Sequence, residues 1–171
     1  MKKMLTAKLI LHSMNNRIVL NTGPIIAFGK IDAFELIKEL PFHFVTPSQV
    51  QTEIGIGASL GYPVVIPSWI EVIRLVNPPS RLALANLDAG EAAVIEAALQ
   101  LEIPIVCIDE LKGRRAALAS GLAVVGSLGI LGKVKSLGLV ASLQPLIKKA
   151  QDNGIYYDPK LVERFLRDVD E

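Results

Sequence analysis

The sequence has few of the residues that build disulfide frameworks or zinc sites. Its 171 residues include one cysteine, Cys107, and two histidines, His12 and His43. A lone cysteine cannot close a disulfide within the chain, and neither histidine stands at metal-ligand spacing from a cysteine or an acid. We therefore expect no structural zinc site, and a protein from a reducing compartment.

A strong net charge is also missing. The chain carries 18 lysines and arginines against 17 aspartates and glutamates, which gives a formal net charge of +1. A molecule so balanced has no overall field that would attract a nucleic acid. Any contact with nucleic acid must therefore come from a local basic patch.

The sequence contains no stretch suited to cross a membrane or to direct export. Residues 116–132 carry no charge, but this stretch is short for a membrane span and is interrupted by Gly121, Gly126 and Gly129. The apolar segment near the N-terminus, residues 9–11, is too brief for a signal peptide and lacks a small-residue cleavage site. We expect a cytoplasmic protein.

The chain that remains is rich in apolar residues. With 51% hydrophobic content, it is long enough for one globular domain that buries roughly 70% of its unfolded surface. We assign this domain to residues 17–171 and interpret residues 1–16 as an N-terminal extension or loose segment. Met14, directly before the first expected strand, is an alternative start of the protein.

Apolar runs alternate with helical patterns along the chain, which is typical of a parallel sheet covered on both faces. The runs predict strands at residues 18–20, 42–45, 103–108 and 122–125, while residues 69–76 form either an edge strand or an irregular connection. Residues 55–61 are expected to form a loop. The helical patterns fall at residues 25–29, 32–40, 49–54, 88–101, 110–120, from 127 onward, 141–150 and 159–169. The predicted fold class is α/β, a three-layer sandwich with a central, mostly parallel sheet flanked by helices.

Four polar residues fall near the ends of these elements. Asn21 follows the first strand and Asp109 the central one, while Glu53 and Glu91 lie on helices. In open parallel sheets, ligands bind beyond the carboxyl ends of the strands, so we expect all four side chains to converge at one edge. Clustered carboxylates repel each other unless a cation neutralises them. The pattern indicates a divalent metal and phosphate chemistry.

Each acid also has a simpler interpretation. Asp109 stands where an N-cap of the following helix is common. Glu91 follows Asp88 at the spacing of a capping box, so it is either a capping partner or a metal ligand. Glu53 taken alone is a solvated charge at a helix end.

Two further segments could contact a phosphate. The glycines of residues 55–61 are spaced unlike a dinucleotide loop and do not follow a strand, so we dismiss them as a nucleotide site. Lys112, Arg114 and Arg115 cluster just beyond Asp109. These cations form either a solvated helix face or a set of phosphate contacts.

In order and spacing, these motifs match a known family. The chain resembles the PIN-domain ribonuclease superfamily, and most closely its stand-alone prokaryotic branch of predicted nucleic-acid-binding proteins related to VapC-type toxins. The likeness covers about residues 17–169. It rests on the segments 19–26, 46–53, 87–92, 108–116 and 125–129, which include Asn-Thr-Gly-Pro after the first strand and Asp-Ala-Gly-Glu before the central one.

The resemblance implies a site and an activity. By position it implies Mg²⁺ or Mn²⁺ held by Asn21, Glu91 and Asp109, catalysis by Glu53, Glu91 and Asp109, and nucleic-acid binding by Thr22, Lys112, Arg114, Arg115 and Ser127. The implied reaction is hydrolysis of phosphodiester bonds in single-stranded RNA. Most active members have aspartate where this chain has Asn21, whose amide offers a carbonyl oxygen without the charge.

Several alternatives stay open at this point. The toxin of a toxin–antitoxin pair, with a small antitoxin protein as partner, is one role that the family offers. A catalytically silent PIN-like scaffold that binds nucleic acid or a protein, and a Rossmann-like nucleotide binder, are the rival functions. The apolar face of the last helix, with Leu161, Phe165 and Val169, either docks within the chain or forms a homodimer contact.

Overall fold

The structure is a computed structural model that describes residues 16–61 and 63–171. Residues 1–15 of the expected N-terminal extension lie outside the described residues, and so do His12 and the alternative start at Met14.

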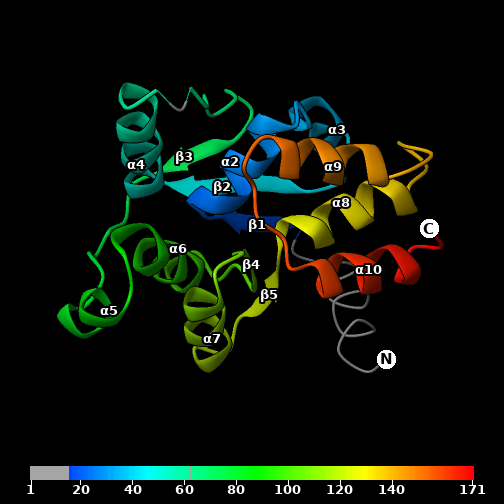
Figure 1. The fold of residues 1–171 in the computed structure, drawn as a ribbon. Coiled ribbons are helices and arrows are strands. Elements are labelled where there is room, and N and C mark those ends of the chain that lie inside the picture. The colour runs from blue at the N-terminus through cyan, green and yellow to red at the C-terminus, as the bar shows by residue number, and fades with distance from the viewer. Residues whose placement is uncertain (1–15, 62) are drawn as a thin grey trace.

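The described chain is built on five parallel strands in the order β3-β2-β1-β4-β5. Val19 of the central strand pairs with Val45 on one side and with Val106 on the other. The expected α/β sandwich with a parallel sheet is confirmed (Figure 1). The strands are β1 (Arg17–Leu20), β2 (His43–Pro47), β3 (Glu71–Ile73), β4 (Ile105–Cys107) and β5 (Ala123–Val125).

Helices cover both faces of this sheet. One layer contains α6 and α7, and the other contains α2 and α3 with α8 and α9 packed against them, while α4 lies between α2 and α6 (Figure 1). The helices are α2 (Thr22–Lys30), α3 (Phe34–Lys38), α4 (Ser48–Ser59), α5 (Arg81–Asn86), α6 (Ala89–Gln100), α7 (Leu111–Ala119), α8 (Ser127–Ser136), α9 (Gln144–Asp152) and α10 (Pro159–Asp168). None of the helices in the described residues combines the length and apolar character that a membrane span requires.

The two layers explain why the strands read as continuous apolar runs. Ile18, Val19 and Leu20 of β1 are fully buried, and so are Val106 and Cys107 of β4. With both faces of the sheet covered, polar side chains are accommodated only where the strands end. Polar side chains of the sheet that could contact a ligand are therefore expected at its edges.

The strand order marks one of these edges. From β1 the chain proceeds outward to β2 and β3, and it then returns to the other side of β1 to form β4 and β5. The order thus reverses between β1 and β4, which is where open α/β sheets bind ligands, beyond the carboxyl ends of the strands. The backbone N–H of Asn21 donates a 3.0 Å hydrogen bond to the backbone carbonyl of Cys107 across this point.

The structure corrects several element boundaries. Residues 55–59 were expected in a loop but continue α4, because this helix packs against α2 and α6 and these contacts outweigh the low helix propensity of Gly55 and Gly57. Helix α5 was not expected; Ser80 caps it by accepting a 3.1 Å hydrogen bond from the Ala83 amide. The cap of α8 is Gly126, and Ser127 is its first helical residue.

The last helix docks within the chain. Phe165 of α10 is buried and its ring lies against Gly132 of α8, where an added Cβ would be 3.1 Å from the ring. Val162 and Leu166 are partly buried beside it. Phe165 therefore follows the intramolecular alternative, whereas Leu161 of the same predicted face stays exposed.

Candidate active site

Four helices present their N-termini at the carboxyl edge of the sheet. Asn21, Asp88, Glu110 and Gly126 are the N-cap residues of α2, α6, α7 and α8. The unpaired backbone N–H groups at a helix N-terminus favour negative charge. We call the polar residues gathered here the carboxyl-edge site, which comprises Asn21, Glu53, Glu91, Asp109 and Glu110.

Glu53 joins three of the helices. Its Oε1 accepts a 2.8 Å hydrogen bond from the Gly90 amide at the start of α6, and its Oε2 accepts a 2.5 Å hydrogen bond from the Thr22 hydroxyl of α2. A Cβ at Gly90 would overlap the Glu53 carboxylate, so a larger residue there would have to displace this carboxylate from its hydrogen bonds. The structure therefore places Glu53 on the same edge as Asn21, and it gives the Thr22 hydroxyl a partner within the protein.

Glu91 is a buried member of a capping box. Its amide donates a 2.6 Å hydrogen bond to Asp88 Oδ1, and its own carboxylate accepts a 3.3 Å hydrogen bond from the Asp88 amide. Glu91 is only 3% exposed. Burial, and then the charge of Asp88, raise its pKa above the ordinary value. Both interpretations from the sequence remain compatible, because one carboxylate oxygen caps the helix while the other lies against Gly113 of α7.

Asp109 is held by the N-terminus of α8. Its Oδ1 accepts a 2.7 Å hydrogen bond from the Ser127 amide. Burial raises the pKa of Asp109, and the Ser127 hydrogen bonds and the charge of Arg114 partly oppose this increase. Arg114 is fixed by a 2.8 Å hydrogen bond that it donates to the Ile108 carbonyl. Asp109 is thus an oriented, partly buried carboxylate rather than the cap of α7.

Asn21 contains an unsatisfied polar atom. The residue is 2% exposed, and its side-chain oxygen Oδ1 has no hydrogen-bond partner within the described part of the chain. A buried oxygen without a partner costs free energy, so native proteins usually give such an atom a ligand, an ion or a water molecule. Asn21 Oδ1 is therefore an acceptor in this site that lacks a hydrogen-bond donor or a cation as its partner.

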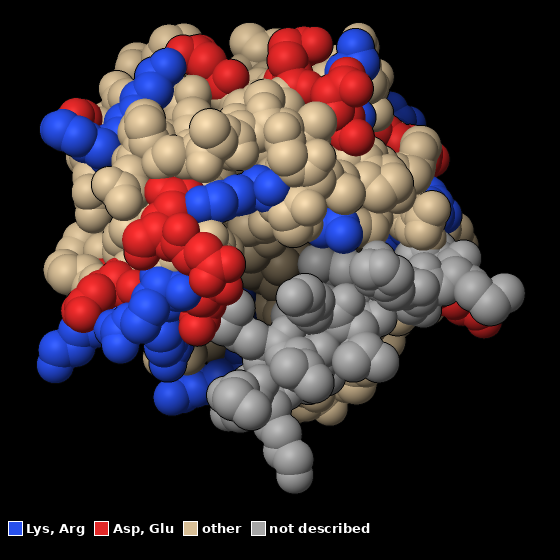
Figure 2. All heavy atoms as spheres, turned by 90° about the vertical axis from the view of Figure 1, so that its right-hand side faces the viewer, with Lys and Arg blue, Asp and Glu red and all other residues tan. Residues whose placement is uncertain are grey.

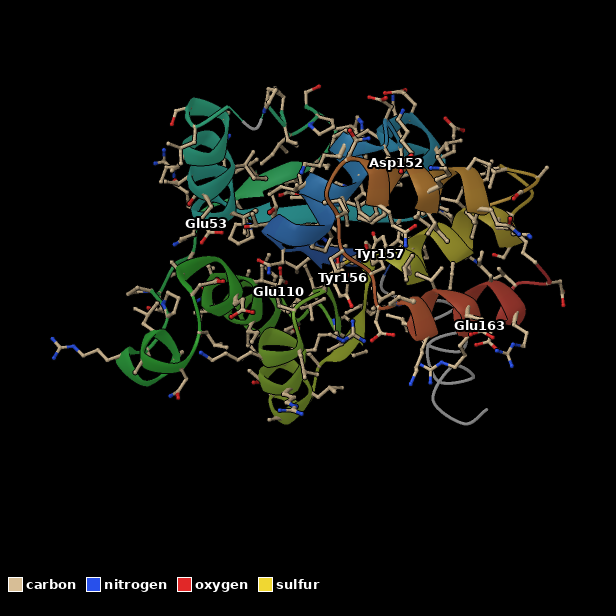
Figure 3. All side chains as sticks on the ribbon, viewed as in Figure 1. Glu53, Glu110, Asp152, Tyr156, Tyr157 and Glu163 are labelled. Carbon is tan, nitrogen blue, oxygen red and sulfur yellow. The ribbon has the colours of Figure 1, made fainter. Side chains whose placement is uncertain are left out.

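Glu110 belongs to the site although the sequence analysis did not select it. The residue as a whole is exposed, but its carboxylate packs over Gly23, where an added Cβ would lie 2.7 Å from Glu110 Oε1. Burial of the carboxylate raises its pKa, a hydrogen bond with its own backbone opposes this increase, and the charges of Asp109 and Asp88 add to it. Its position directly after Asp109 was a usable signal. Figure 3 shows Glu110 and Glu53 entering from different elements.

Tyr157 is a second residue that the sequence did not reveal. It lies between α9 and α10, is buried, and makes a 2.8 Å hydrogen bond through its hydroxyl to Ser127 Oγ (Figure 3). Burial raises the pKa of Tyr157 to about 12. Nothing in its local sequence pattern indicates this contact, since Ser127 is thirty residues away along the chain.

The basic residues are divided between two environments. Lys112 and Arg115 are exposed on α7, while Arg114 is partly buried at the sheet end. The described part of the face on the right-hand side of Figure 1 carries basic and acidic side chains next to each other, without one continuous basic surface (Figure 2). The ordered hydroxyl of Ser127 is already bonded to Tyr157. Nucleic-acid binding by these residues stays a prediction.

The acids share an edge but do not form a closed metal cage. In the described ranges, no group of three or more acidic, histidine or cysteine side chains could hold a metal ion by itself. Backbone amides at the starts of α6 and α8 donate hydrogen bonds to Glu53 and Asp109. These hydrogen bonds reduce the repulsion between the carboxylates without a cation. A divalent cation that keeps several of its waters needs only one or two carboxylates, fewer than such a group would supply.

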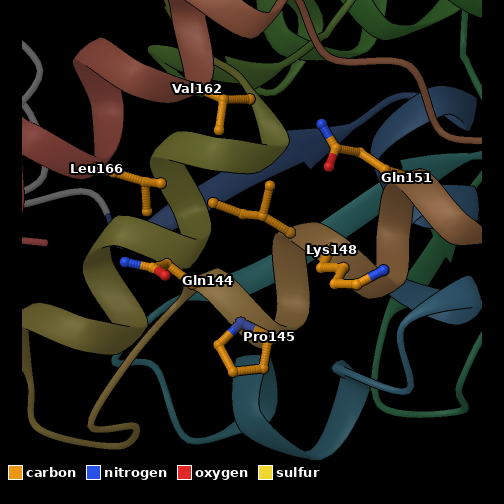
Figure 4. A pocket seen from close by; sticks show the side chains of 7 residues that line it. Gln144, Pro145, Lys148, Gln151, Val162 and Leu166 are labelled. Atoms are coloured by element: carbon orange, nitrogen blue, oxygen red, sulfur yellow. The ribbon is translucent and has the colours of Figure 1, made fainter.

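A surface groove of about 490 Å³ lies elsewhere, between α9 and α10 (Figure 4). Its walls combine apolar side chains with amide and lysine groups: Gln144, Pro145, Ile147, Lys148, Gln151, Val162 and Leu166. None of the acids of the carboxyl-edge site lines it.

Comparison with known proteins gives one match. A family model described as a PIN domain matches residues 17–171. No curated protein and no solved structure matches the chain.

Proposed function

Because the chain belongs to the PIN-domain family, we propose that it is a metal-dependent nuclease that hydrolyses phosphodiester bonds of single-stranded RNA at the carboxyl-edge site. The observation that carries this proposal is the buried, unpartnered Oδ1 of Asn21 next to oriented carboxylates at the reversal of strand order. A site of this kind supplies the oxygen ligands that Mg²⁺ and Mn²⁺ prefer.

The proposed roles follow from the contacts of each side chain. Asn21, Glu91 and Asp109 would hold the ion, with Asp109 kept in place by the Ser127 amide. When bound, such an ion activates a water molecule and stabilises the charge that develops on the phosphate. Glu53 has both oxygens fixed by Thr22 and Gly90, which leaves lone pairs in a defined direction to orient the attacking water.

The substrate would be held by cations near this edge. Lys112 and Arg115 project from α7, the helix whose N-cap is Glu110, and are free to contact backbone phosphates. With a formal net charge of +1, the protein would rely on such local contacts rather than on a general field. A flexible single strand can follow this edge more closely than a duplex can.

The test combines metal binding with RNA cleavage. We expect the natural protein to bind Mn²⁺ in calorimetry and to cleave a fluorogenic single-stranded RNA, and we expect Asp109→Asn to lose both. Asp152→Asn is the matched control, because Asp152 is an exposed residue of α9 that pairs with Lys148. If Asp109→Asn keeps the metal-dependent cleavage of the natural protein, the proposed site is wrong.

A silent scaffold is the second candidate. Asn21 is neutral where most active members of the family have an aspartate. The N-termini of α6 and α8 already donate hydrogen bonds to Glu53 and Asp109, so these carboxylates have partners without a metal ion. A scaffold would bind RNA with no metal-dependent cleavage in the same assay. The nucleotide-binding alternative lacks support, because the glycines at positions 55 and 57 belong to helix α4 rather than to a phosphate-binding loop.

A toxin role is proposed as an extension of the nuclease function. An antitoxin partner would be a small protein that blocks the carboxyl-edge site, and co-expression with the product of the neighbouring reading frame tests this through loss of RNA cleavage.

A homodimer is proposed through the exposed side of α10, where Leu161 is 41% exposed. Sedimentation of Leu161→Lys beside the natural protein tests that contact.

A further inference from the structure

Tyr156 is an exposed aromatic residue in a chain that has few aromatic residues. Its side chain is 81% exposed, and it is the one aromatic residue among the exposed large hydrophobic side chains of the described ranges. The next residue, Tyr157, is buried. A single exposed apolar side chain is common on protein surfaces, so what Tyr156 can bind depends on its surroundings.

The backbone that carries Tyr156 is fixed on both sides. Before it, the Ile155 amide donates a 2.9 Å hydrogen bond to the Ala150 carbonyl in α9. After it, the Asp158 carboxylate caps α10 by accepting two hydrogen bonds from backbone amides of the first turn. The ring of Tyr156 is thus presented from a fixed segment, and a partner that packs on it has little backbone freedom to remove.

Tyr156 lies beside the carboxyl-edge site. The Tyr157 hydroxyl is 2.8 Å from Ser127 Oγ, and the Ser127 amide donates a hydrogen bond to Asp109. Since consecutive Cα atoms are about 3.8 Å apart, Tyr156 begins one residue away from this series of contacts. In the view of Figure 3, Tyr156 is seen between Glu110 and Tyr157. A polymer bound at the carboxyl-edge site would therefore lie within reach of this ring.

Helix α10 follows this segment and carries cations on its outer side. Lys160 and Arg164 are exposed and four residues apart, so they share one side of the helix, whereas Phe165 is buried against α8. In the described part of the chain neither cation forms an ion pair, while Arg167 pairs with Glu163 at 3.0 Å. The charges of Lys160 and Arg164 are thus available to an anionic partner.

We infer that Tyr156, Lys160 and Arg164 form a strip that binds single-stranded RNA, in which a base stacks on the ring and the two cations contact neighbouring backbone phosphates. We call these three residues the α10 strip. This inference rests on the proposed function and extends the RNA contacts beyond the carboxyl-edge site. Proteins bind single strands by combining aromatic platforms with cations that follow the backbone. A duplex keeps its bases stacked within the helix, so the ring favours a single strand.

The role of the ring is tested by RNA binding without cleavage. Fluorescence anisotropy of a labelled single-stranded oligouridylate is measured with the full chain in a chelating buffer, which prevents metal-dependent cleavage. Tyr156→Leu keeps an apolar side chain but removes the ring, and it should weaken binding about tenfold. Tyr156→Phe is the matched control and should bind as the natural protein does. An abasic oligonucleotide of the same length should bind equally to Tyr156→Leu and the natural protein, because it has no base to stack.

The role of the cations is tested by the salt dependence of the same binding. For single strands, the logarithm of the binding constant falls with the logarithm of the salt concentration, with a slope of about 0.7 per phosphate contact. Lys160→Gln and Arg164→Gln should each reduce this slope by about 0.7, whereas Tyr156→Leu should leave it unchanged. Lys148→Gln is the charge-matched control, because Lys148 pairs with Asp152 on α9, and it should keep the slope of the natural protein.

The outcomes separate this inference from the proposed function. If Tyr156→Leu binds the oligouridylate as well as the natural protein does, the inference fails and the nuclease proposal stands. The inference also fails if Tyr156→Leu changes only self-association in sedimentation, since the ring would then contact a protein. If the α10 strip binds RNA but Mn²⁺ produces no cleavage, the nuclease proposal fails and the inference stands. A natural protein that binds no single-stranded RNA overturns both. Weaker binding of Tyr156→Leu at an unchanged slope, with reduced slopes for Lys160→Gln and Arg164→Gln, supports the inference.

Discussion

Tyr157 and Ser127 are joined by a 2.8 Å hydrogen bond between two buried hydroxyl groups. The same Ser127 donates its amide proton to Asp109 Oδ1 at 2.7 Å. The connection between α9 and α10 is thereby linked to the carboxylate at the end of β4. The segment between α9 and α10 thus contacts the candidate active site through Ser127, although no acid of these two helices belongs to the site.

Removing the Tyr157 hydroxyl should therefore destabilise the protein. In Tyr157→Phe the Ser127 hydroxyl is left buried without its partner, and we expect a loss of about 1–2 kcal/mol in the free energy of unfolding. Urea denaturation monitored by circular dichroism measures the change. Tyr156→Phe is the control, because Tyr156 is 81% exposed and should lose almost nothing. Equal losses in the two variants would contradict the role given to this bond.

Asn21→Asp should increase metal affinity at the expense of metal-free stability. The substitution places a formal charge where Asn21 has a neutral oxygen, and charge-assisted ligation is stronger than ligation by an amide. We expect tighter Mn²⁺ binding and faster cleavage of single-stranded RNA. The metal-free variant should melt at a lower temperature, because the new carboxylate is buried beside Glu110. Calorimetry, a fluorogenic RNA assay and thermal melting check the three effects.

The result also separates the two candidate functions. A variant that binds Mn²⁺ more tightly and still cleaves no RNA would favour the silent scaffold. A variant that binds no Mn²⁺ would leave the carboxylates with a structural role alone.

The charge of Asp109 should make the metal-free protein less stable as the pH rises. Burial raises the pKa of Asp109 above its ordinary value, so the folded state holds this proton more tightly than the unfolded state does. Unfolding stability then falls as the pH rises from the ordinary value of 3.8 through the raised one. Asp109→Asn removes this effect and should be more stable than the natural protein at about pH 7, with a smaller difference at about pH 4.

Urea denaturation in a chelating buffer at the two pH values measures this difference. Asp152→Asn, which alters an exposed carboxylate, should show no such gain near neutral pH. A variant of Asp109 that is less stable than the natural protein at both pH values would contradict the argument.

Glu171 should contribute stability with the opposite pH dependence. Burial alone would raise its pKa, but hydrogen bonds from Lys135, Ser142 and backbone amides such as that of Leu143 outweigh burial and lower the pKa to about 2. The folded state therefore releases this proton more readily than the unfolded state. The resulting stability is fully present above the ordinary pKa of 4.5 and is lost as the pH falls toward about 2.

The variant Glu171→Gln isolates this contribution. Its melting temperature should lie below that of the natural protein near neutral pH, and the two should converge on acidification. Glu163→Gln is the control, because Glu163 is exposed and pairs with Arg167 on the same helix and should change the melting temperature little. A gap that does not close at low pH would show that the Glu171 side chain acts through packing instead.

The amino-acid sequence by itself determined the layered α/β class and most element positions. Runs such as Ile18, Val19 and Leu20 are too short for a helix and apolar at every position, which is typical of a strand covered on both faces. The capping box of Asp88 and Glu91 was also predictable, because both partners lie within one helical turn. Asn21 and Asp109 could be placed at one edge from the sequence because each follows closely on a strand of the parallel sheet, β1 and β4. Local patterns of this kind need no information about distant parts of the chain.

The tertiary structure decided the contacts between distant segments. Helix α4 continues through Gly55 and Gly57 because it packs between α2 and α6, which no local propensity expresses. Glu110 enters the site because Gly23 leaves room for its carboxylate, and Tyr157 reaches Ser127 from beyond α9. These contacts depend on how helices from separate parts of the chain pack at one sheet edge. Sequence spacing carries no record of such distances, so the charge balance around Asn21 became visible only in three dimensions.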